Sequence, residues 1–271
     1  MRRKKAEEGR GKSLKTLLIF CFIVFLLVSI SLAIKAFAII KVSKFDGSHR
    51  FTLALSTKEK SGVEVLSFDP KNKTISVLRI KGRVDNRKIG RVLATYIDGD
   101  IVQKTEIKKE QIGKKLFSLA MSPDVVKTNI TFIDLARLSY FVSKVADKDV
   151  TSEEIELPQS ETQIDRLSGA LFEDSDIVSE NMSIEIVNAT GVFGFGGRLE
   201  RTLSNMGAQV VSVSTALRDE DATRLQYAEN KSYTVEKLQR ILNVQAKKQN
   251  GLSISDIKII LGKSSLSTEA F

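Results

Sequence analysis

One uninterrupted apolar run constrains this sequence more than any other feature. Residues 17–34 read LLIFCFIVFLLVSISLAI, which is eighteen residues without a charge. As a helix this run is about 27 Å long, close to the hydrocarbon thickness of a bilayer. Because it is apolar on every side, it has no polar face to offer water. We therefore expect residues 17–40 to form a transmembrane helix.

The basic residues gather in front of this run. Residues 1–16 hold seven Lys or Arg and two Glu, and we expect them to form a basic cytoplasmic tail. The positive-inside rule then places the N-terminus in the cytoplasm and everything after Lys41 outside. The alternative is a signal peptide cleaved near Ala36-Phe37-Ala38, but Lys35 and the length of the run favour an uncleaved, single-pass anchor in the cell membrane.

The remaining composition excludes several classes of protein. The net charge is +9, but after residue 44 the chain has 32 basic and 31 acidic residues, so it lacks the basic surface that nucleic acids require. With one cysteine (Cys21) and one histidine (His49), neither a disulfide framework nor a multi-histidine metal site can form. We interpret His49 as exposed and inert.

The exported part has the pattern of an α+β protein with two small α/β-sandwich-type domains. In the first, residues 45–146, the runs 51–55, 63–68 and 74–80 predict an antiparallel meander. Residues 91–97 are expected to continue the sheet. A helix is predicted near residues 107–120, and a capping box at Thr131 and Asp134 predicts the start of another.

The second half begins with an acidic segment. Residues 147–180 hold eleven acidic and two basic residues, so we expect 147–181 to be a linker with one short helix at 164–172. Residues 182–263 then follow the order β-α-β-β-α-β, which predicts a ferredoxin-like split βαβ domain.

Two patterns are candidates for binding. A glycine-rich turn joins the first strand of the last domain to its helix, and its marked residues are Asn188, Gly191, Gly194 and Gly197. Such a turn can cradle an anion, but the glycine spacing departs from the dinucleotide fingerprint, so we favour tight strand–helix packing. A basic run follows the meander and supplies a candidate anion site at Arg79, Arg83, Arg87 and Arg91. A solvated loop partly balanced by Asp85 explains that run equally well.

The last domain resembles the C-terminal domain of LytR-type envelope proteins. The resemblance rests on Ile184-Glu185-Ile186-Val187-Asn188-Ala189-Thr190-Gly191-Val192, on Gly194, Gly197 and Gly207, on the strand 210–213, and on the closing strand 256–262. Where the family continues its turn with Gly-Leu-Ala, this chain has Gly194-Phe195-Gly196.

Residues 65–78 and 129–145 resemble the catalytic domain of the LytR-CpsA-Psr family in shortened form. The resemblance implies phosphotransfer of polyprenyl-pyrophosphate-linked glycopolymers onto the cell wall, using arginines, acids and magnesium. The family's Ile-Pro-Arg-Asp is replaced here by Ile80-Lys81-Gly82-Arg83. A second aspartate, which the family has at the start of its first long strand, falls on Ser61 or Gly62. Because a divalent cation needs oxygen ligands, these replacements oppose metal binding. We therefore expect no catalytic residue, no metal site and no cofactor.

The leading expectation is therefore a membrane-anchored, extracytoplasmic, non-catalytic binding or assembly module of the bacterial cell envelope. Its expected partners are the membrane and either a cell-wall glycopolymer or other envelope proteins, without nucleic acid. The alternatives are a divergent phosphotransferase and a purely structural protein that pairs through its membrane span.

Overall fold

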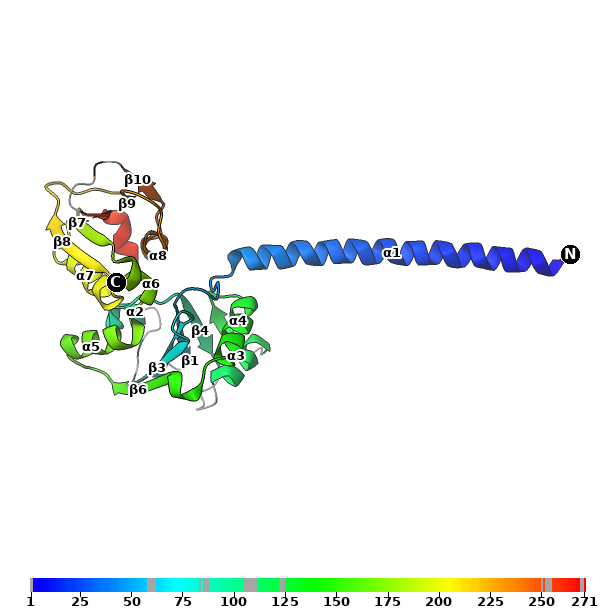
Figure 1. The fold of residues 1–271 in the computed structure, drawn as a ribbon, viewed down its shortest axis with the longest axis horizontal. Helices are drawn as coiled ribbons and strands as arrows, with labels where there is room; N and C mark the ends of the chain where they lie inside the picture. Colours follow the sequence, from blue (N-terminus) through cyan, green and yellow to red (C-terminus); the bar gives the residue numbers. More distant parts are fainter. Residues whose placement is uncertain are drawn as a thin grey trace. The chain divides into compact units, whose positions relative to one another are not determined.

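The protein is described here from a computed structural model that covers residues 2–57, 62–82, 84, 88–104, 112–121, 125–249, 251, 255–268 and 271. The chain divides into two compact units, Met1–Ser43 and Lys44–Phe271. Figure 1 shows the elements of each unit.

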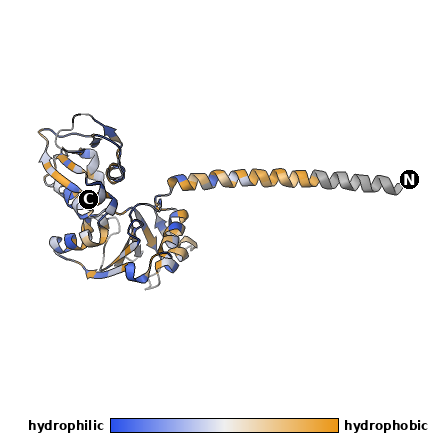
Figure 2. Ribbon diagram, viewed as in Figure 1, coloured by the Kyte–Doolittle hydropathy of each residue, from blue (hydrophilic) through white to orange (hydrophobic). Residues whose placement is uncertain are grey.

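The first unit is one helix, α1 (Arg2–Val42). Its segment Leu17–Val42 is 26 residues long with a mean hydropathy of 3.1, and the described large apolar side chains along it are exposed except for Ile39, which is partly exposed. Figure 2, coloured by residue hydropathy, shows mostly hydrophobic residues along the coloured part of this helix. The helix predicted over 17–40 is confirmed, and its length and composition suit a membrane span.

The second unit begins with a six-stranded sheet. Its strands are β1 (Phe51–Thr57), β2 (Gly62–Asp69), β3 (Thr74–Lys81), β4 (Gly99–Gln103), β5 (Val125–Thr128) and β6 (Val150–Glu156), in the order β5-β4-β1-β2-β3-β6. The predicted meander is confirmed, because β1, β2 and β3 pair antiparallel with Leu53 opposite Leu66 and Leu66 opposite Val77.

Helices cover both faces of this sheet. Leu116 of α3 (Ile112–Met121) and Leu138 of α4 (Phe132–Val142) pack with Phe68 in one core. On the other face, α2 (Ile89–Leu93) and α5 (Glu161–Phe172) pack in a second core that includes Leu78. Figure 1 shows these two pairs of helices on opposite sides of the strands. The expected α/β sandwich is thus present.

The capping box at the start of α4 is confirmed. The Thr131 side chain accepts from the Asp134 backbone N–H, and the Asp134 carboxylate accepts from the Thr131 backbone N–H at 2.7 Å. Asp134 also accepts the backbone N–H groups of Lys44 and Phe45, each at 2.8 Å. One fully buried carboxylate therefore fixes both the helix and the chain that enters the sheet.

Two sequence predictions in this unit differ from the structure. Residues 91–97 do not form a strand, because α2 ends at Leu93 and Ala94 turns the chain with a φ of 44° before β4 begins. The acidic segment 147–181 is not a spacer, because it holds the short 3₁₀ helix η2 (Asp147–Asp149), strand β6, helix α5 and helix α6 (Ser175–Glu180). β6 is an edge strand, so most of its charged side chains are exposed, which explains a composition that resembles a linker.

The second sheet is five-stranded. It comprises β7 (Ser183–Asn188), β8 (Gln209–Thr215), β9 (Arg224–Tyr227), β10 (Ala246–Lys248) and β11 (Ile257–Leu261), in the order β10-β9-β11-β7-β8, with α7 (Phe195–Asn205), α8 (Tyr233–Leu242) and the 3₁₀ helix η3 (Lys263–Ser267). The predicted element order holds, with β10 added after α8. The split βαβ prediction is wrong, because β7 and β8 are direct parallel neighbours and β11 lies on the other side of β7.

Candidate functional site

Arg79, the first residue of the predicted basic run, is part of an internal ion-pair cluster. Its Nε lies 3.1 Å from Glu64 Oε1, and its Nη1 donates to Ser152 at 2.8 Å. The other Glu64 oxygen accepts from Lys115, and both Glu64 and Lys115 are buried. Arg79 therefore links β3 to its neighbouring strands β2 and β6.

Of the other members of the basic run, Arg91 is the one that the structure describes, and it does not join the Arg79 cluster. Arg83 and Arg87 lie outside the described residues. Arg91 lies on α2, where its Nε donates to a main-chain oxygen of Phe271, the last residue of the sequence, at 3.2 Å. Arg91 lines a cavity of about 500 Å³ together with Arg198 and Arg201 from α7, two residues that the sequence pattern did not single out.

Lys81 is the last residue of β3. It belongs to the segment 80–83, which stands where the LytR-CpsA-Psr family has Ile-Pro-Arg-Asp. Lys81 forms an ion pair with Glu154 on the adjacent edge strand β6. The hydrogen bond to Glu154, followed by its charge, raises the pKa of Lys81 above its ordinary value. The side chain is exposed and contacts a strand neighbour.

The glycine-rich turn is held by its own hydrogen bonds. Asn188 Oδ1 accepts from the Thr190 backbone N–H at 3.1 Å and from its hydroxyl at 2.7 Å, while Nδ2 donates to the Val192 carbonyl at 2.8 Å. Gly191 has a φ of +75°, and a Cβ there would lie 2.6 Å from an Asp219 carboxylate oxygen. Gly194, with a φ of +74°, precedes α7, whereas a Cβ on Gly197 would meet open space. Gly191 is therefore required by its φ and by Asp219, whereas Gly194 and Gly197 show no close contact that would require the absence of a side chain.

A buried polar network joins the two sheets. Lys237 of α8 lies 2.8 Å from Asp98 Oδ1 and 3.0 Å from Oδ2, and both side chains are almost fully buried. Asp98 Oδ2 also accepts the Thr52 backbone N–H of β1 at 2.9 Å. The positive charge of Lys237 on α8 is thus balanced by Asp98, the residue immediately before β4.

His49 belongs to the same junction. Its ring stacks on Tyr233 with 4.0 Å between centroids and 17° between planes. Its Nδ1 lies 2.8 Å from Asp176 Oδ2, and Lys71 donates to the other Asp176 oxygen at 3.0 Å. The His49 side chain is still 36% exposed, but it is also stacked and hydrogen-bonded, because the segment before β1 packs against α6 and α8. That His49 is inert stays a prediction.

The carboxyl groups at this junction have opposite pKa shifts. Burial raises the pKa of Asp174 despite the nearby Lys237 and the hydrogen bond from Tyr233 Oη at 2.8 Å. Burial together with the Asp174 charge raises the pKa of the Tyr233 hydroxyl. At Asp176 burial also acts upward, but hydrogen bonds from His49 and Lys71 outweigh it and lower the pKa.

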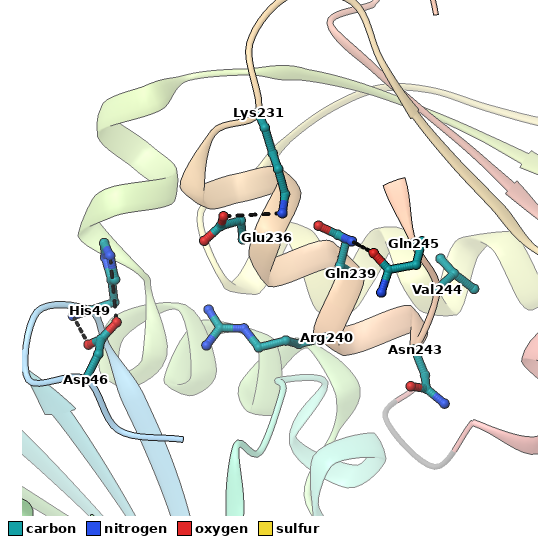
Figure 3. Close-up of a pocket in the computed structure, with 9 residues that line it drawn as sticks. All are labelled: Asp46, His49, Lys231, Glu236, Gln239, Arg240, Asn243, Val244 and Gln245. Carbon is teal, nitrogen blue, oxygen red and sulfur yellow. Dashed lines mark hydrogen bonds and ion pairs between the residues drawn. The ribbon is translucent and has the colours of Figure 1, made fainter. Parts of the chain in front are cut away.

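A polar groove opens beside this junction. It encloses about 540 Å³ and is lined by Asp46, His49, Lys231, Glu236, Gln239, Arg240, Asn243, Val244 and Gln245. Figure 3 shows the Arg240 side chain extending from α8 toward the segment that carries Asp46 and His49. The Gln239 and Gln245 amides bond each other at 3.1 Å, and Lys231 pairs with Glu236 at 3.4 Å. The groove thus presents amide, cationic and anionic groups on a fixed frame.

Sequence patterns could not reveal this groove. Its residues come from the segment before β1 and from the region around α8, which are far apart in the sequence and meet only through the fold. In the part of the chain that the structure describes, no group of three or more His, Cys, Asp or Glu side chains is placed to hold a metal ion.

Comparisons with known proteins give one family match. Residues 181–264 match the family LytR_C, described as "LytR cell envelope-related transcriptional attenuator". A search of curated proteins finds no match.

Two solved structures show a partial likeness. The Lin1025 protein from Listeria innocua is 11% identical over 44% of this chain and 95% of its own, with a TM-score of 0.34. TagT from B. subtilis is 12% identical over 48% of this chain and 93% of its own, with a TM-score of 0.33. On the family match, the C-terminal sheet with its two helices, residues 181–264, is a LytR_C domain.

Proposed function

We propose that this protein is a single-pass, membrane-anchored module of the bacterial cell envelope that binds cell-wall glycopolymers without modifying them. The cytoplasmic end is the basic N-terminus, and Lys44–Phe271 works outside the membrane. Support comes from the cell-envelope family of residues 181–264, from the apolar segment Leu17–Val42, and from the charge in front of that segment.

The polar groove is the observation that carries this proposal. A glycan presents many hydroxyl groups, each of which donates and accepts hydrogen bonds. Amide side chains such as Gln239, Asn243 and Gln245 also donate and accept, and Arg240 adds a fork of donors. The buried contacts between α8 and the first sheet hold these groups in place, which lowers the entropy cost of binding.

The surroundings of Arg79 and Glu64 favour binding over catalysis. A phosphotransferase that used Arg79 on a pyrophosphate would need its guanidinium for the substrate, yet that group contacts Glu64 and Ser152. The Glu64 carboxylate in turn bonds Lys115, which competes with any cation. Residues 80–83, which stand where the family has Ile-Pro-Arg-Asp, also disfavour catalysis, because they offer no carboxylate to a metal ion.

A binding experiment tests the groove. The full chain, held in phosphatidylcholine nanodiscs, is sedimented with purified cell walls that either retain their glycopolymers or have been stripped of them by acid. We expect binding to the intact walls and a loss of about tenfold in affinity when Gln239→Ala, Gln245→Ala and Asn243→Gly are combined. Glycine is chosen for Asn243 because this residue has a φ of 53°.

The matched control is Gln209→Ala, which removes an exposed amide on β8, away from the groove. It should bind like the parent chain. Equal binding to stripped walls, or full binding by the triple variant, would contradict the proposal.

A further inference from the structure

Helices α3 and α4 carry apolar side chains that the described fold leaves uncovered. Phe117 and Met121 on α3, and Phe132 and Tyr140 on α4, are each more than half exposed. The two helices pack together on one face of the first sheet (Figure 1). Outside α1, three of the four exposed aromatic side chains among the described residues lie on this pair, and such a concentration marks an interaction surface.

The exposed charges on the same two helices are basic. Phe132 and Tyr140 are eight residues apart and so lie on one side of α4, and the Lys144 Nζ lies 5.2 Å from the centroid of the Tyr140 ring. Lys114 is exposed on α3. The one acidic residue of either helix, Asp134, is fully buried. Aromatic and basic groups without exposed acids are typical of helices that lie on a membrane surface.

The chain that leaves α1 is fastened to the first turn of α4. Asp134 accepts the backbone N–H groups of Lys44 and Phe45, each at 2.8 Å. Arg137 donates to the Phe45 carbonyl oxygen at 2.9 Å. Only Ser43 lies between Lys44 and the end of α1. Because one residue spans at most about 3.6 Å, the covalent connection keeps the start of α4 close to the end of α1 at any angle between the two units.

The length of the apolar segment puts this connection at the bilayer surface. Leu17–Val42 spans about 39 Å as a helix, whereas a bilayer is about 30 Å thick in its hydrocarbon core and about 40–45 Å with its headgroups. A membrane-spanning segment of this length therefore ends among the outer headgroups, and Lys44 follows two residues later.

We propose, on the basis of the membrane anchoring proposed above, that α3 and α4 rest on the outer leaflet of the bilayer. Phe132 and Tyr140 lie at the level of the headgroups, where aromatic side chains are favoured. Lys114 and Lys144 contact the phosphate groups of anionic lipids, to which their charge is complementary. The tether holds the two helices at a high effective concentration next to the lipid, so individually weak contacts suffice.

Tryptophan fluorescence tests this docking, because the chain has no tryptophan of its own. Tyr140→Trp places one indole on α4. The matched control is Phe193→Trp, because Phe193 is also an exposed aromatic residue but lies in the glycine-rich turn of the LytR_C domain. Each full-length variant is held in nanodiscs of phosphatidylcholine and phosphatidylglycerol, with or without bromine near the headgroup end of the acyl chains. Brominated lipid should quench the indole at position 140 and leave the indole at position 193 unquenched.

The lipid charge provides a second arm of the test. Replacing phosphatidylglycerol by phosphatidylcholine, or combining Lys114→Gln with Lys144→Gln, should reduce the quenching at position 140. Quenching that ignores both changes would overturn the contact between these lysines and the headgroups.

The remaining outcomes separate docking from anchoring. An unquenched indole at position 140, in chains that the nanodiscs retain, would overturn the docking and leave the anchoring intact. Chains that the nanodiscs do not retain would overturn both. Equal quenching at positions 140 and 193 would overturn the docking through α4. Emission at position 140 that follows protein concentration instead of bromine would assign this face to a second copy of the chain.

Discussion

Asp174 illustrates how a single carboxyl group is placed at the junction between the sheets. It is 1% exposed, caps α6 through the Asp176 backbone N–H at 3.1 Å, and accepts the Tyr233 hydroxyl. Its raised pKa means that the folded state favours the protonated form. Stability from this group is therefore lost as the pH rises from about 3.9, its unfolded value, through the raised folded value.

Asp174→Asn removes this loss. The amide oxygen still caps α6, and the amide N–H group still bonds Tyr233, but no charge is buried at neutral pH. We expect the variant to lose less stability than the parent chain between pH 4 and pH 7, as measured by the melting temperature of the full chain followed by circular dichroism. An identical pH dependence in the two proteins would contradict this.

Asp176→Asn is the matched comparison, because the pKa of Asp176 is lowered. Its stabilisation is present above its unfolded pKa and disappears as the pH falls through the lower folded pKa. The variant should therefore be less stable than the parent at pH 7 and should approach it in acid.

Residue-level predictions from the sequence succeeded where the cause was local. Thr131 and Asp134 are three residues apart, so their capping box is visible in the sequence. His49 and Tyr233 meet only through tertiary packing, so no local pattern could show that the histidine is stacked and hydrogen-bonded.

At the scale of elements, helix α8 is the link between the LytR_C domain and the first sheet. Lys237→Met should destabilise the full chain by about 3–5 kcal/mol, because Asp98 would remain buried without its cation. Combining it with Asp98→Asn should recover much of this loss, since asparagine still accepts the Thr52 N–H. Denaturant unfolding measures both variants, and equal stability of the single and double variants would contradict the role of the pair.

Elements were predicted well where hydrophobic alternation marks them and poorly where composition misleads. The meander strands are rich in apolar residues and are largely buried, as central strands are, and their bounds agree with the sequence pattern to within a few residues. β6 is acidic because it is an edge strand paired only with β3, so its sequence resembles a spacer. The order of elements along the chain does not determine which strands pair, so it could not show that β7 lies between β8 and β11.

At the scale of the whole molecule, the proposal requires that α1 crosses the membrane with its basic end inside. Cys21 is the only cysteine, so replacing it with alanine leaves a background for single-cysteine labelling. With a membrane-impermeant maleimide on intact cells, Gln209→Cys should be labelled and Ser13→Cys protected until the cells are opened. Labelling of Ser13→Cys in intact cells, or protection of Gln209→Cys, would reverse or exclude this topology.

The central claim is that the protein holds a glycopolymer without transferring it. The most direct measurement incubates the full chain in nanodiscs with a lipid-linked glycopolymer, magnesium and purified cell wall, and follows both retained polymer and polymer covalently joined to the wall. The account predicts retention that depends on the groove and no covalent transfer. Turnover that disappears on Arg91→Ala would contradict it and would assign the protein to the phosphotransferases.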